Sequence, residues 1–510
     1  MNVVKTITLQ HYGKKYSGKT RDFYIIRNKR IIISTDRISA FDQILGFIPH
    51  KGQVLSQLSQ FWFEKTKDII PNHFIAMPDP QVLVVKNAKL IPIEMVVRGY
   101  ITGVTGTSIW GSYEKGERII YGLKFPDGLK KNQKLKTPVL TPTTKSEVGH
   151  DERLTKDEII KRRIVPKEIY EKMEKVALKL FARGTKICKK AGIILVDTKY
   201  EFGLTDGKLI LIDEIHTPDS SRFWIKKTYK DRFKNGQEPE NFDKEFLRLW
   251  FKKKGYSGKG IPPIMTRAFV QEVSKRYTDI FTRITRKKFI SAKGFVNNRI
   301  KKNLKKYFSS QPISIAVLIS NGGTATNLQG IIDAIEQKRL HAKISIVVSD
   351  KKDAYGLQRA KKHKIKSAIS PTKDDLLEIL LKYDIEYLAL AGWKQFLSDE
   401  VLEKYQNKIL NLHPGLIPDK LDGAVKNPDG THGLWNKKKF TNKALQNFLD
   451  SHATYAGSSI HFLTKEIDLG PVLGRCFEKI QSRDTIDSLY TRLKKKENKL
   501  YITVLKKLSH

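Results

Sequence analysis

Cysteine is nearly absent from this 510-residue chain, which has only Cys188 and Cys476. One pair cannot build a disulfide framework and its spacing fits no metal-ligand motif, so a reducing, cytoplasmic compartment is expected. No run approaches about 18 apolar residues, and the N-terminal segment MNVVKTITLQHYGKKYSGK lacks the apolar core of a signal peptide. We therefore expect neither secretion nor a membrane partner.

Acidic residues are also scarce, with 53 Asp and Glu against 95 Lys and Arg, which gives a formal net charge of +42. The segment 281–310 holds ten basic residues and no acidic one. We interpret its later part as a linker or a final solvated helix between two globular units. A surface for a polyanion is the alternative, but no motif for reading RNA or DNA accompanies it, so nucleic acid is not the favoured partner.

Hydrophobic residues make up 40% of the chain, which is enough for buried cores and excludes wholesale disorder. A chain of this length should contain two or more domains. We expect a first domain over 1–285, a basic linker over 286–311 and a second domain over 312–510.

The two domains differ in the pattern of their elements. In the first, strands are predicted over 22–27, 30–35, 81–86, 93–98, 193–197 and 209–213, and helices over 53–68, 167–191 and 263–280. This mixture predicts an α+β fold. The second alternates strands with helices, starting from a strand over 313–320, a Gly-rich loop and a helix over 327–336, with further strands over 344–349, 387–390 and 408–412. Such alternation predicts an α/β, doubly wound parallel sheet.

A short basic turn, Gly18-Lys19-Thr20-Arg21, lies between strand-like segments of the first domain. Glycine lets backbone N–H groups approach a phosphate, while Lys and Arg supply charge and forked donors. The tetrapeptide is neither a Walker loop nor a kinase Gly-rich loop, and alone it is typical of a surface turn.

A second pattern in the first domain brings carboxylates together beside a lysine. Alternation places Asp197, Lys199 and Glu201 on one strand face, and Asp213 and Glu214 end the neighbouring strand. Such a cluster is costly unless a cation neutralises it, and Mg²⁺ commonly bridges carboxylates to nucleotide phosphates. The pattern favours an ATP- and Mg²⁺-dependent ligase or kinase with an anionic substrate, with a solvated hairpin of ordinary salt bridges as the alternative.

In the second domain, polar residues follow strands at the edge where doubly wound folds place ligands. The loop 319–329 opens a helix, a context that favours phosphate binding, although no G-x-G-x-x-G is present and a plain turn remains the alternative. Asn411 and His413 point to the same side at a strand end, and His461 and Asp468 follow. These residue types can supply a proton shuttle and an oxyanion donor for acyl transfer. A serine nucleophile elbow is absent, which disfavours a covalent hydrolase.

An ordered set of motifs over about residues 10–285 resembles the SAICAR synthetase (phosphoribosylaminoimidazole-succinocarboxamide synthase) family. The motifs are DRISAFD at 36–42, MVVRGY at 95–100, TPTTK at 141–145, GHDE at 149–152, DTKYEFG at 197–203 and TPDSSRFW at 217–224. The resemblance implies an ATP-grasp-like α+β fold. It also implies joining of L-aspartate to carboxyaminoimidazole ribonucleotide, with ATP split to ADP and phosphate.

The resemblance further implies roles for matching residues. Gly18, Lys19 and Arg21 would hold the ATP phosphates, Lys199 would neutralise the transferring phosphoryl group, and Glu201 and Asp213 would bind Mg²⁺. Arg98 and Arg222 would hold the ribose phosphate of the substrate. The imidazole and aspartate pockets would be formed by Ser39, Asp42, Lys145, His150, Asp151, Asp219 and Ser220.

The second domain resembles, over about 313–505, the glycinamide ribonucleotide (GAR) formyltransferase family, which has a Rossmann-like fold. The motifs are GTATNLQ at 323–329, NLHPGLIP at 411–418 and GSSIHFLTKEIDLGP at 457–471. The resemblance implies transfer of a formyl group from 10-formyltetrahydrofolate to the amine of GAR.

By the same match, Asn411 would polarise the formyl carbonyl, His413 would assist and move protons, and Asp468 would orient His413. The remaining implied contacts are Gly323, Thr324, Thr326 and Asn327 for the GAR phosphate, Glu497 for the GAR amine end, and Leu390, Gly392 and Ile460 for the folate. His461 would support the site.

Three departures from these families stand out. Val104 occupies a position where some SAICAR synthetases have a phosphate-binding serine, Trp393-Lys394 stands beside the folate pocket, and the segment 419–451 is longer than the compact pattern. That segment could form a lid or an interface loop.

Taken together, the two resemblances predict a bifunctional enzyme of purine biosynthesis. A single active module, or a polyanion-binding protein that uses the linker, is the alternative, and a homo-oligomer is left open.

Overall fold

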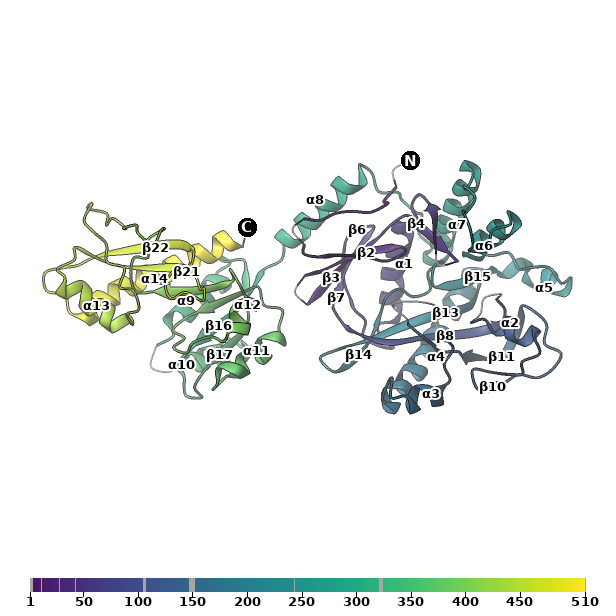
Figure 1. Cartoon of the computed structure of the whole chain (residues 1–510), viewed down its shortest axis with the longest axis horizontal. Coiled ribbons are helices and arrows are strands. Elements are labelled where there is room, and N and C mark those ends of the chain that lie inside the picture. The colour runs from purple at the N-terminus through teal and green to yellow at the C-terminus, as the bar shows by residue number, and fades with distance from the viewer. Residues whose placement is uncertain are drawn as a thin grey trace. The chain divides into compact units, whose positions relative to one another are not determined.

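The chain divides into two compact units, Met1–Lys305 and Lys306–His510 (Figure 1). The computed structural model describes residues 3–10, 12–26, 28–41, 43–103, 107–145, 152–242, 244–320 and 324–509. No helix among these residues has the length and apolar character needed to cross a bilayer. The division falls at 305/306, so most of the stretch that we predicted as a linker lies in the first unit.

Unit 1 is built on two antiparallel sheets. The first has the order β1-β2-β3-β7-β6, with β1 Lys15–Ser17, β2 Arg21–Ile26, β3 Lys29–Ser34, β7 Val82–Lys86 and β6 Phe74–Asp79. The second has the order β11-β8-β13-β14, with β12 on β8 and β15 on β13; these are β11 Gln133–Leu140, β8 Lys89–Ile101, β13 Ile193–Thr205, β14 Lys208–Ile212, β12 Thr143–Thr144 and β15 Ser221–Ile225. Two small hairpins complete it: β4 Arg37–Ala40 with β5 Gln43–Phe47, and β9 Ile119–Ile120 with β10 Leu123–Lys124.

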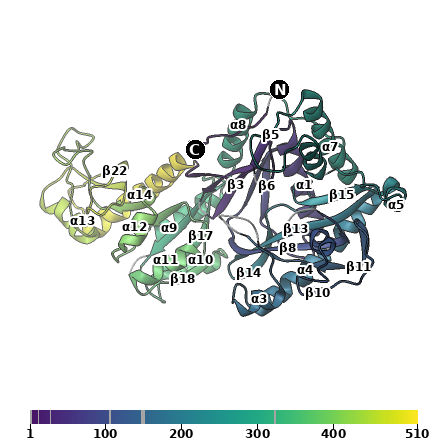
Figure 2. The same cartoon turned by 45° about the vertical axis from the view of Figure 1, so that its right-hand side comes forward.

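Helices fill the space beside these sheets (Figures 1 and 2). Helix α1 packs on β3, β6 and α7, and α4 packs on β13 and β8. The helices of this part are α1 Lys51–Thr66, α2 Ile109–Glu114, α3 Lys156–Lys161, α4 Lys167–Lys190, α5 Lys226–Lys234, α6 Lys244–Lys253, α7 Arg267–Thr285 and α8 Val296–Ser309. The predicted helices over 53–68 and 167–191 therefore correspond to α1 and α4 within two residues at each end.

The sequence of α4 shows why it forms and what it buries. Apolar residues recur at three- and four-residue spacing, so Tyr170, Met173, Ala177 and Leu180 share one buried stripe. Pro166 precedes the first turn, where its missing N–H costs nothing, and Gly192 follows the last turn at φ 74°. The stripe packs against the second sheet and joins the main core of unit 1.

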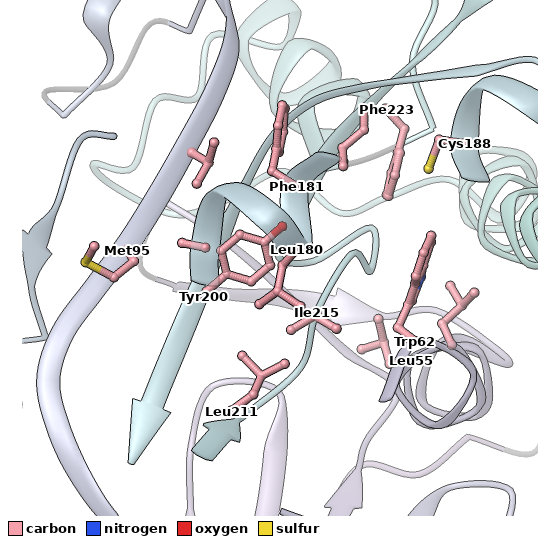
Figure 3. Close-up of a cluster of buried hydrophobic side chains, with 14 of the residues drawn as sticks. Leu55, Trp62, Met95, Leu180, Phe181, Cys188, Tyr200, Leu211, Ile215 and Phe223 are labelled. Atoms are coloured by element: carbon pink, nitrogen blue, oxygen red, sulfur yellow. The ribbon is translucent and has the colours of Figure 1, made fainter. Parts of the chain in front are cut away.

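A buried histidine, His216, contacts Tyr200 and Trp62, two residues of the core shown in Figure 3. His216 Nε2 and the Tyr200 hydroxyl share a hydrogen bond of 2.6 Å. The His216 ring also contacts the Trp62 ring edge to face, with the ring centroids 4.5 Å apart. Tyr200 and Trp62 lie with Leu180 and Phe181 in the same cluster. Burial lowers the pKa of His216 to about 3, so the ring is neutral and acts as a core residue.

Buried ion pairs and a hydrogen bond around Asp219 join α1, α6 and α7 to the loop after β14. Asp219 Oδ2 lies 2.8 Å from Lys51 Nζ of α1 and 3.0 Å from Lys244 Nζ of α6. The Tyr277 hydroxyl of α7 donates to Asp219 Oδ1 at 2.6 Å. Burial pushes the pKa of Asp219 upward, but the charges of Lys244 and Lys51 outweigh it and hold this pKa well below its usual range.

Helix α8 is the structure that the basic stretch adopts. Val296, Ile300 and Leu304 form its buried stripe. The guanidinium of Arg299 pairs with Asp79, with Nε at 2.9 Å from Oδ2, and Asn303 donates to the same carboxylate at 2.8 Å. The stretch is therefore fastened to the turn between β6 and β7, while its lysines stay exposed.

Unit 2 is a seven-stranded sheet with the order β18-β17-β16-β19-β20-β21-β22. Pairing is parallel from β18 to β20 and antiparallel from β20 to β22. The strands are β16 Ile313–Ile319, β17 Ala342–Ser349, β18 Ser367–Ile369, β19 Tyr387–Leu390, β20 Ile409–His413, β21 Tyr455–Phe462 and β22 Val472–Lys479. The predicted parallel alternation is thus correct for five strands, and the two antiparallel strands extend it.

Both faces of this sheet are covered. Ile315 and Val317 of β16 face a core that includes residues of α9, α10, α13 and α14, whereas Ala316 and Leu318 face a core with residues of α11 and α12. A fully apolar strand with buried alternate residues is typical of a sheet covered on both sides. The helices are α9 Thr326–Glu336, α10 Tyr355–Lys362, α11 Lys373–Leu381, α12 Asp399–Lys404, α13 Thr441–Asp450 and α14 Ile486–Leu508.

Gly184 of α4 should not tolerate alanine. A Cβ at this position would lie 2.4 Å from Cε1 of the buried His216 ring. Overpacking of this kind costs about 1–3 kcal/mol, which exceeds the roughly 1 kcal/mol that alanine gains in a helix. Thermal unfolding should therefore show a lower Tm for Gly184→Ala. The control is Gly330→Ala in α9, where the nearest atoms are at 3.7 Å and the Tm should stay or rise.

Asp219→Asn should cost about 3–5 kcal/mol of unfolding free energy at pH 7, because it leaves Lys51 and Lys244 without a buried counter-charge. Since the pKa of Asp219 is lower in the folded state, its contribution is fully present above the unfolded value of about 4 and is lost as pH falls below it. The difference between wild type and variant in urea unfolding should shrink as pH falls from 5 to 3.5. Asp127→Asn, at an exposed ion pair with Arg118, should change stability by under about 1 kcal/mol at every pH.

Candidate active sites

The turn between β1 and β2 is fixed by hydrogen bonds to its backbone, most of them from the side chain of Arg37. The Gly18 N–H donates to the Arg21 carbonyl at 2.8 Å, and the Arg37 guanidinium donates to the carbonyls of Gly18 at 2.9 Å and Lys19 at 3.2 Å. With its carbonyls occupied, the turn directs the Arg21 side chain to the end of β14. There Arg21 Nη1 pairs with Asp213, and Nη2 pairs with the next residue, Glu214, at 2.7 Å.

A lysine surrounded by carboxylates lies beside this turn. Lys199 of β13 pairs with Glu201 on the same strand, with Glu94 of β8 at 2.7 Å and with Asp213 at 3.5 Å. Lys145, just after β12, pairs with Glu201 from the other side. The predicted meeting of Lys199, Glu201 and Asp213 is therefore confirmed by the distances.

The charges of this cluster are strongly coupled. Burial and the charge of Asp213 raise the pKa of Glu201, although Lys199 and Lys145 oppose them. Burial also pushes the pKa of Asp213 upward, but Arg21 and Lys199 outweigh it and hold that pKa well below its usual range. Burial alone would lower the pKa of Lys199, and its carboxylate neighbours instead raise it well above the ordinary value. The site is therefore one where an added cation and an added phosphate would both find partners.

Two arginines converge on one carboxylate near the cluster. Asp197 Oδ2 lies 2.7 Å from Arg222 Nη1 of β15 and 3.2 Å from Arg98 Nη1 of β8. Arg98 Nε also donates to Thr141 Oγ1 at 2.8 Å. Both arginines, with Lys199, line a cavity of about 160 Å³. Forked donors that line a small cavity suit a phosphate group.

The remaining predicted residues of unit 1 fall into three groups. Ser39 is buried in β4, and Ser220 bonds within its turn to Thr217 while its carbonyl accepts from the Lys199 N–H at 3.1 Å. Asp219 lines the 160 Å³ cavity, but its carboxylate already pairs with Lys51 and Lys244. Asp42, His150 and Asp151 lie outside the described residues, as does Val104.

Sequence reasoning missed Glu94, which completes the shell of Lys199. It lies at a partly buried position of β8 between Ile93 and Met95, which are fully buried. A carboxylate between two apolar residues of the strand was the available signal. Lys51 and Lys244 were missed as well, because a lysine at a helix start carries no sign that it will be buried.

In unit 2, a neutral histidine orients Asn411. Asn411 of β20 and His461 of β21 are paired across the antiparallel ladder, and Asn411 Nδ2 donates to His461 Nε2 at 3.1 Å. The other ring nitrogen faces the Phe462 carbonyl at 3.2 Å. Burial, with a contribution from the charge of His413, lowers the pKa of His461 to about 4. The ring is therefore neutral near pH 7 and accepts the amide hydrogen of Asn411.

His413, two residues on, has an acceptor at each ring nitrogen. Nδ1 lies 3.2 Å from Asp468 Oδ1, and Nε2 lies 2.8 Å from the Trp435 carbonyl of the long segment 419–451. These two contacts fix the orientation of the His413 ring. Burial raises the pKa of Asp468, but its hydrogen bond with His413 and the backbone N–H of Lys438 lower it overall, so the carboxylate is charged.

The Gly-rich loop meets the start of α9 as predicted. Ala325 adopts the left-handed conformation at φ 50° before the first helical residue, Thr326. The side-chain oxygens of Thr326 and Asn327 are buried and have no partner among the described residues. Lys494 Nζ donates to Thr324 Oγ1 at 3.1 Å. Gly323 lies outside the described residues.

The other predicted residues of unit 2 are buried to different degrees. Glu497 of α14 accepts from Ser458 Oγ at 2.6 Å, and burial raises its pKa. Leu390 and Ile460 belong to the two cores on opposite faces of the sheet, while Gly392 is exposed at φ 95°.

Within the described residues of both units, no group of three or more His, Cys, Asp or Glu side chains is arranged to hold a metal ion.

Known proteins resemble the two units separately. The profile of the SAICAR synthetase family matches residues 14–263, and the formyl transferase profile matches residues 313–505. A phosphoribosylaminoimidazole-succinocarboxamide synthase of Legionella pneumophila (strain Paris) is 47% identical over 306 residues, which cover 59% of this chain and 98% of that protein.

Solved structures show the same division. The SAICAR synthase of Saccharomyces cerevisiae, in complex with SAICAR, is 32% identical and covers 56% of this chain and 99% of that one, with a TM-score of 0.50. A phosphoribosylglycinamide formyltransferase of Coxiella burnetii is 31% identical and covers 39% of this chain and 88% of that one, with a TM-score of 0.33. From the two profile matches, the Legionella relative and the two clusters above, the chain belongs to the SAICAR synthetase family and carries a formyl transferase domain as its second unit.

Proposed function

We propose that the chain is a bifunctional enzyme of purine biosynthesis. Unit 1 joins L-aspartate to carboxyaminoimidazole ribonucleotide, giving SAICAR, ADP and phosphate, and unit 2 transfers the formyl group of 10-formyltetrahydrofolate to GAR. The observation that carries this proposal is that two clusters of the expected residue types occur in one chain. Lys199 with its carboxylates lies in unit 1, and Asn411 with His413 and Asp468 lies in unit 2.

In unit 1, ATP would lie under the turn Gly18–Arg21. Backbone N–H groups, Lys19 and Arg21 would bind its phosphates, and Lys199 would neutralise the phosphoryl group as it passes to the carboxylate of the substrate. The resulting acyl phosphate would be attacked by the amine of aspartate. The turn is held from behind by Arg37, so this geometry exists before the nucleotide binds.

The carboxylates of Glu201 and Asp213 fit a role in holding Mg²⁺. They are hard oxygen donors, they converge on one lysine, and burial beside Asp213 raises the pKa of Glu201 as expected where a positive charge is still needed. When bound, Mg²⁺ supplies charge neutralisation for the nucleotide phosphates. Two carboxylates suffice, because Mg²⁺ completes its shell with water and phosphate oxygens.

The ribose phosphate of the substrate would bind in the 160 Å³ cavity. Arg98 and Arg222 converge on a single carboxylate, Asp197, at the wall of this cavity, and their forked guanidinium groups match the geometry of a phosphate. Ser39, Asp42, Lys145, His150, Asp151, Asp219 and Ser220 remain the proposed residues of the imidazole and aspartate pockets.

In unit 2, the Asn411 amide would donate to the formyl oxygen as negative charge develops on it. His461 orients this amide by accepting one of its hydrogens. His413, held between Asp468 and the Trp435 carbonyl, would stabilise the same charge and return a proton to the leaving nitrogen. The buried oxygens of Thr326 and Asn327 lie where the GAR phosphate would be bound, and Glu497 would face the amine end.

Several finer features of the chain are also proposals. They are the ATP-grasp-like and Rossmann-like classes of the two folds, the folate contacts near Leu390, Gly392 and Ile460, a cytoplasmic location and the domain limits 1–285 and 312–510. The two profile matches, over 14–263 and 313–505, fall inside those limits, whereas the first compact unit continues to Lys305.

Two single variants should separate the activities. Asp213→Ala should reduce aspartate ligation by on the order of 10²–10³-fold or more, because it removes a partner of Arg21 and a proposed Mg²⁺ ligand, and leave formyl transfer unchanged. Asp468→Ala should do the reverse, because His413 loses its counter-charge. Both products are measured with purified protein and each unit's substrates. A folded variant that loses both activities would contradict two independent sites.

Chelation should affect one activity only. Excess EDTA should abolish aspartate ligation, because Glu201 and Asp213 are proposed to hold Mg²⁺, and should leave formyl transfer within about twofold, because no metal is assigned to unit 2. Added Mg²⁺ should restore ligation. Ligation that persists in EDTA at full rate would remove the metal from the proposal, and equal loss of both activities would indicate a general effect on the protein.

A further inference from the structure

Unit 1 contains a second cavity, of about 480 Å³, that shares no lining residue with the cavity beside Arg98 and Arg222. Its walls come from the start of α1, from α7 and from the basic stretch that leads into α8. The volume lies within the range of small-molecule sites. Neither proposed activity uses this cavity.

The lining carries positive charge and no negative charge. His50, Lys275 and Arg299 line the cavity, and none of its lining residues is Asp or Glu. Nε and Nη2 of Arg299 donate hydrogen bonds to Asp79 and Gln81. Among the described residues, its Nη1 makes one long contact, at 3.4 Å with the Ala292 carbonyl. Donor capacity of Arg299 therefore remains on the cavity side, beside the exposed ammonium of Lys275.

The cavity is already formed, because its walls are bonded to one another. The buried side chain of Gln53 accepts from the Ala292 N–H at 3.0 Å, which joins α1 to the basic stretch. Ser274 Oγ donates to the Pro49 carbonyl at 2.7 Å, which joins α7 to α1. Ser291 and His50 bond at 3.2 Å across the same seam. Binding of a ligand would therefore cost little conformational entropy, because these groups are already ordered.

The surrounding charge favours an anion. The stretch 281–310, which supplies one wall, has ten basic residues and no acidic one. Basic charge of this kind on one wall of a concave site raises the local concentration of anions. A phosphate would take charge-assisted hydrogen bonds from Lys275 and Arg299, and the ring of His50, the amide of Gln271 and the hydroxyl of Thr278 line the cavity where a sugar or base would lie.

We propose that this cavity binds a phosphomonoester of about the size of a nucleoside monophosphate, at a site separate from both catalytic clusters. The charged groups recognise the phosphate, and the polar wall of α1 and α7 recognises the rest of the molecule. Inorganic phosphate alone would leave most of the volume to water, so it should bind more weakly.

The test is equilibrium dialysis of labelled AMP against the purified full chain, with Mg²⁺ and a saturating non-hydrolysable ATP analogue that occupies the nucleotide site. AMP should still bind. Lys275→Glu should weaken this binding about tenfold or more. The matched control is Lys301→Glu, an equal charge reversal at an exposed position of α8 that does not line the cavity, and it should change the affinity less than about twofold. Inorganic phosphate should bind at least tenfold more weakly than AMP.

Four results would overturn the proposal: no AMP binding at millimolar concentration, complete displacement by the ATP analogue, equal weakening by the two charge reversals, or inorganic phosphate binding as tightly as AMP. Circular dichroism shows that each variant is folded. The two enzyme activities are measured on the same samples, so failure of the proposed function is distinguished from failure of this site.

Discussion

Burying a charge in this fold requires a partner group, and in the two sites most of the partners come from other strands and loops. Strand β13 shows it best, because Asp197, Lys199 and Glu201 all lie on its central part. None of them could be buried alone, since a single uncompensated charge in the interior costs several kcal/mol. Their partners come from β8, β15, the end of β14 and the segment after β12. Neutralising this strand therefore assembles the proposed ATP and phosphate sites.

The same constraint works differently in unit 2, where the charges are fewer. Asp468 is neutralised by His413 and by the backbone N–H of Lys438. Because His413 also faces the Trp435 carbonyl, the long segment 419–451 takes part in fixing the ring. A histidine ring with an acceptor near each nitrogen is held in one orientation. The insertion that sequence comparison marked as a departure is therefore connected directly to the proposed acid.

Much of the fold followed from pattern alone. The strand 387–390 and the helix 327–336 agree with β19 and α9 to within one residue. The strand over 193–197 was predicted too short, because polar residues at 198–205 interrupt the apolar run that marks a strand, yet β13 continues through them to Thr205. These polar residues are tolerated in the sheet because they carry the site. Similarly, the basic stretch looked like a tether, and its three apolar residues at four-residue spacing form the buried side of α8.

The sequence by itself determined the chemistry of this protein, because the residues that carry it stand in contiguous motifs whose spacing is readable on a strand or at a strand end. It placed Lys199 with Glu201, and Asn411 with His413, since both pairs are two residues apart. Only the tertiary structure decided the partners that lie far apart in the chain, such as Arg21 with Asp213, and Lys51 with Asp219. Their distances depend on how sheets and helices pack, and the 480 Å³ cavity, lined by segments more than 200 residues apart, exists only through that packing.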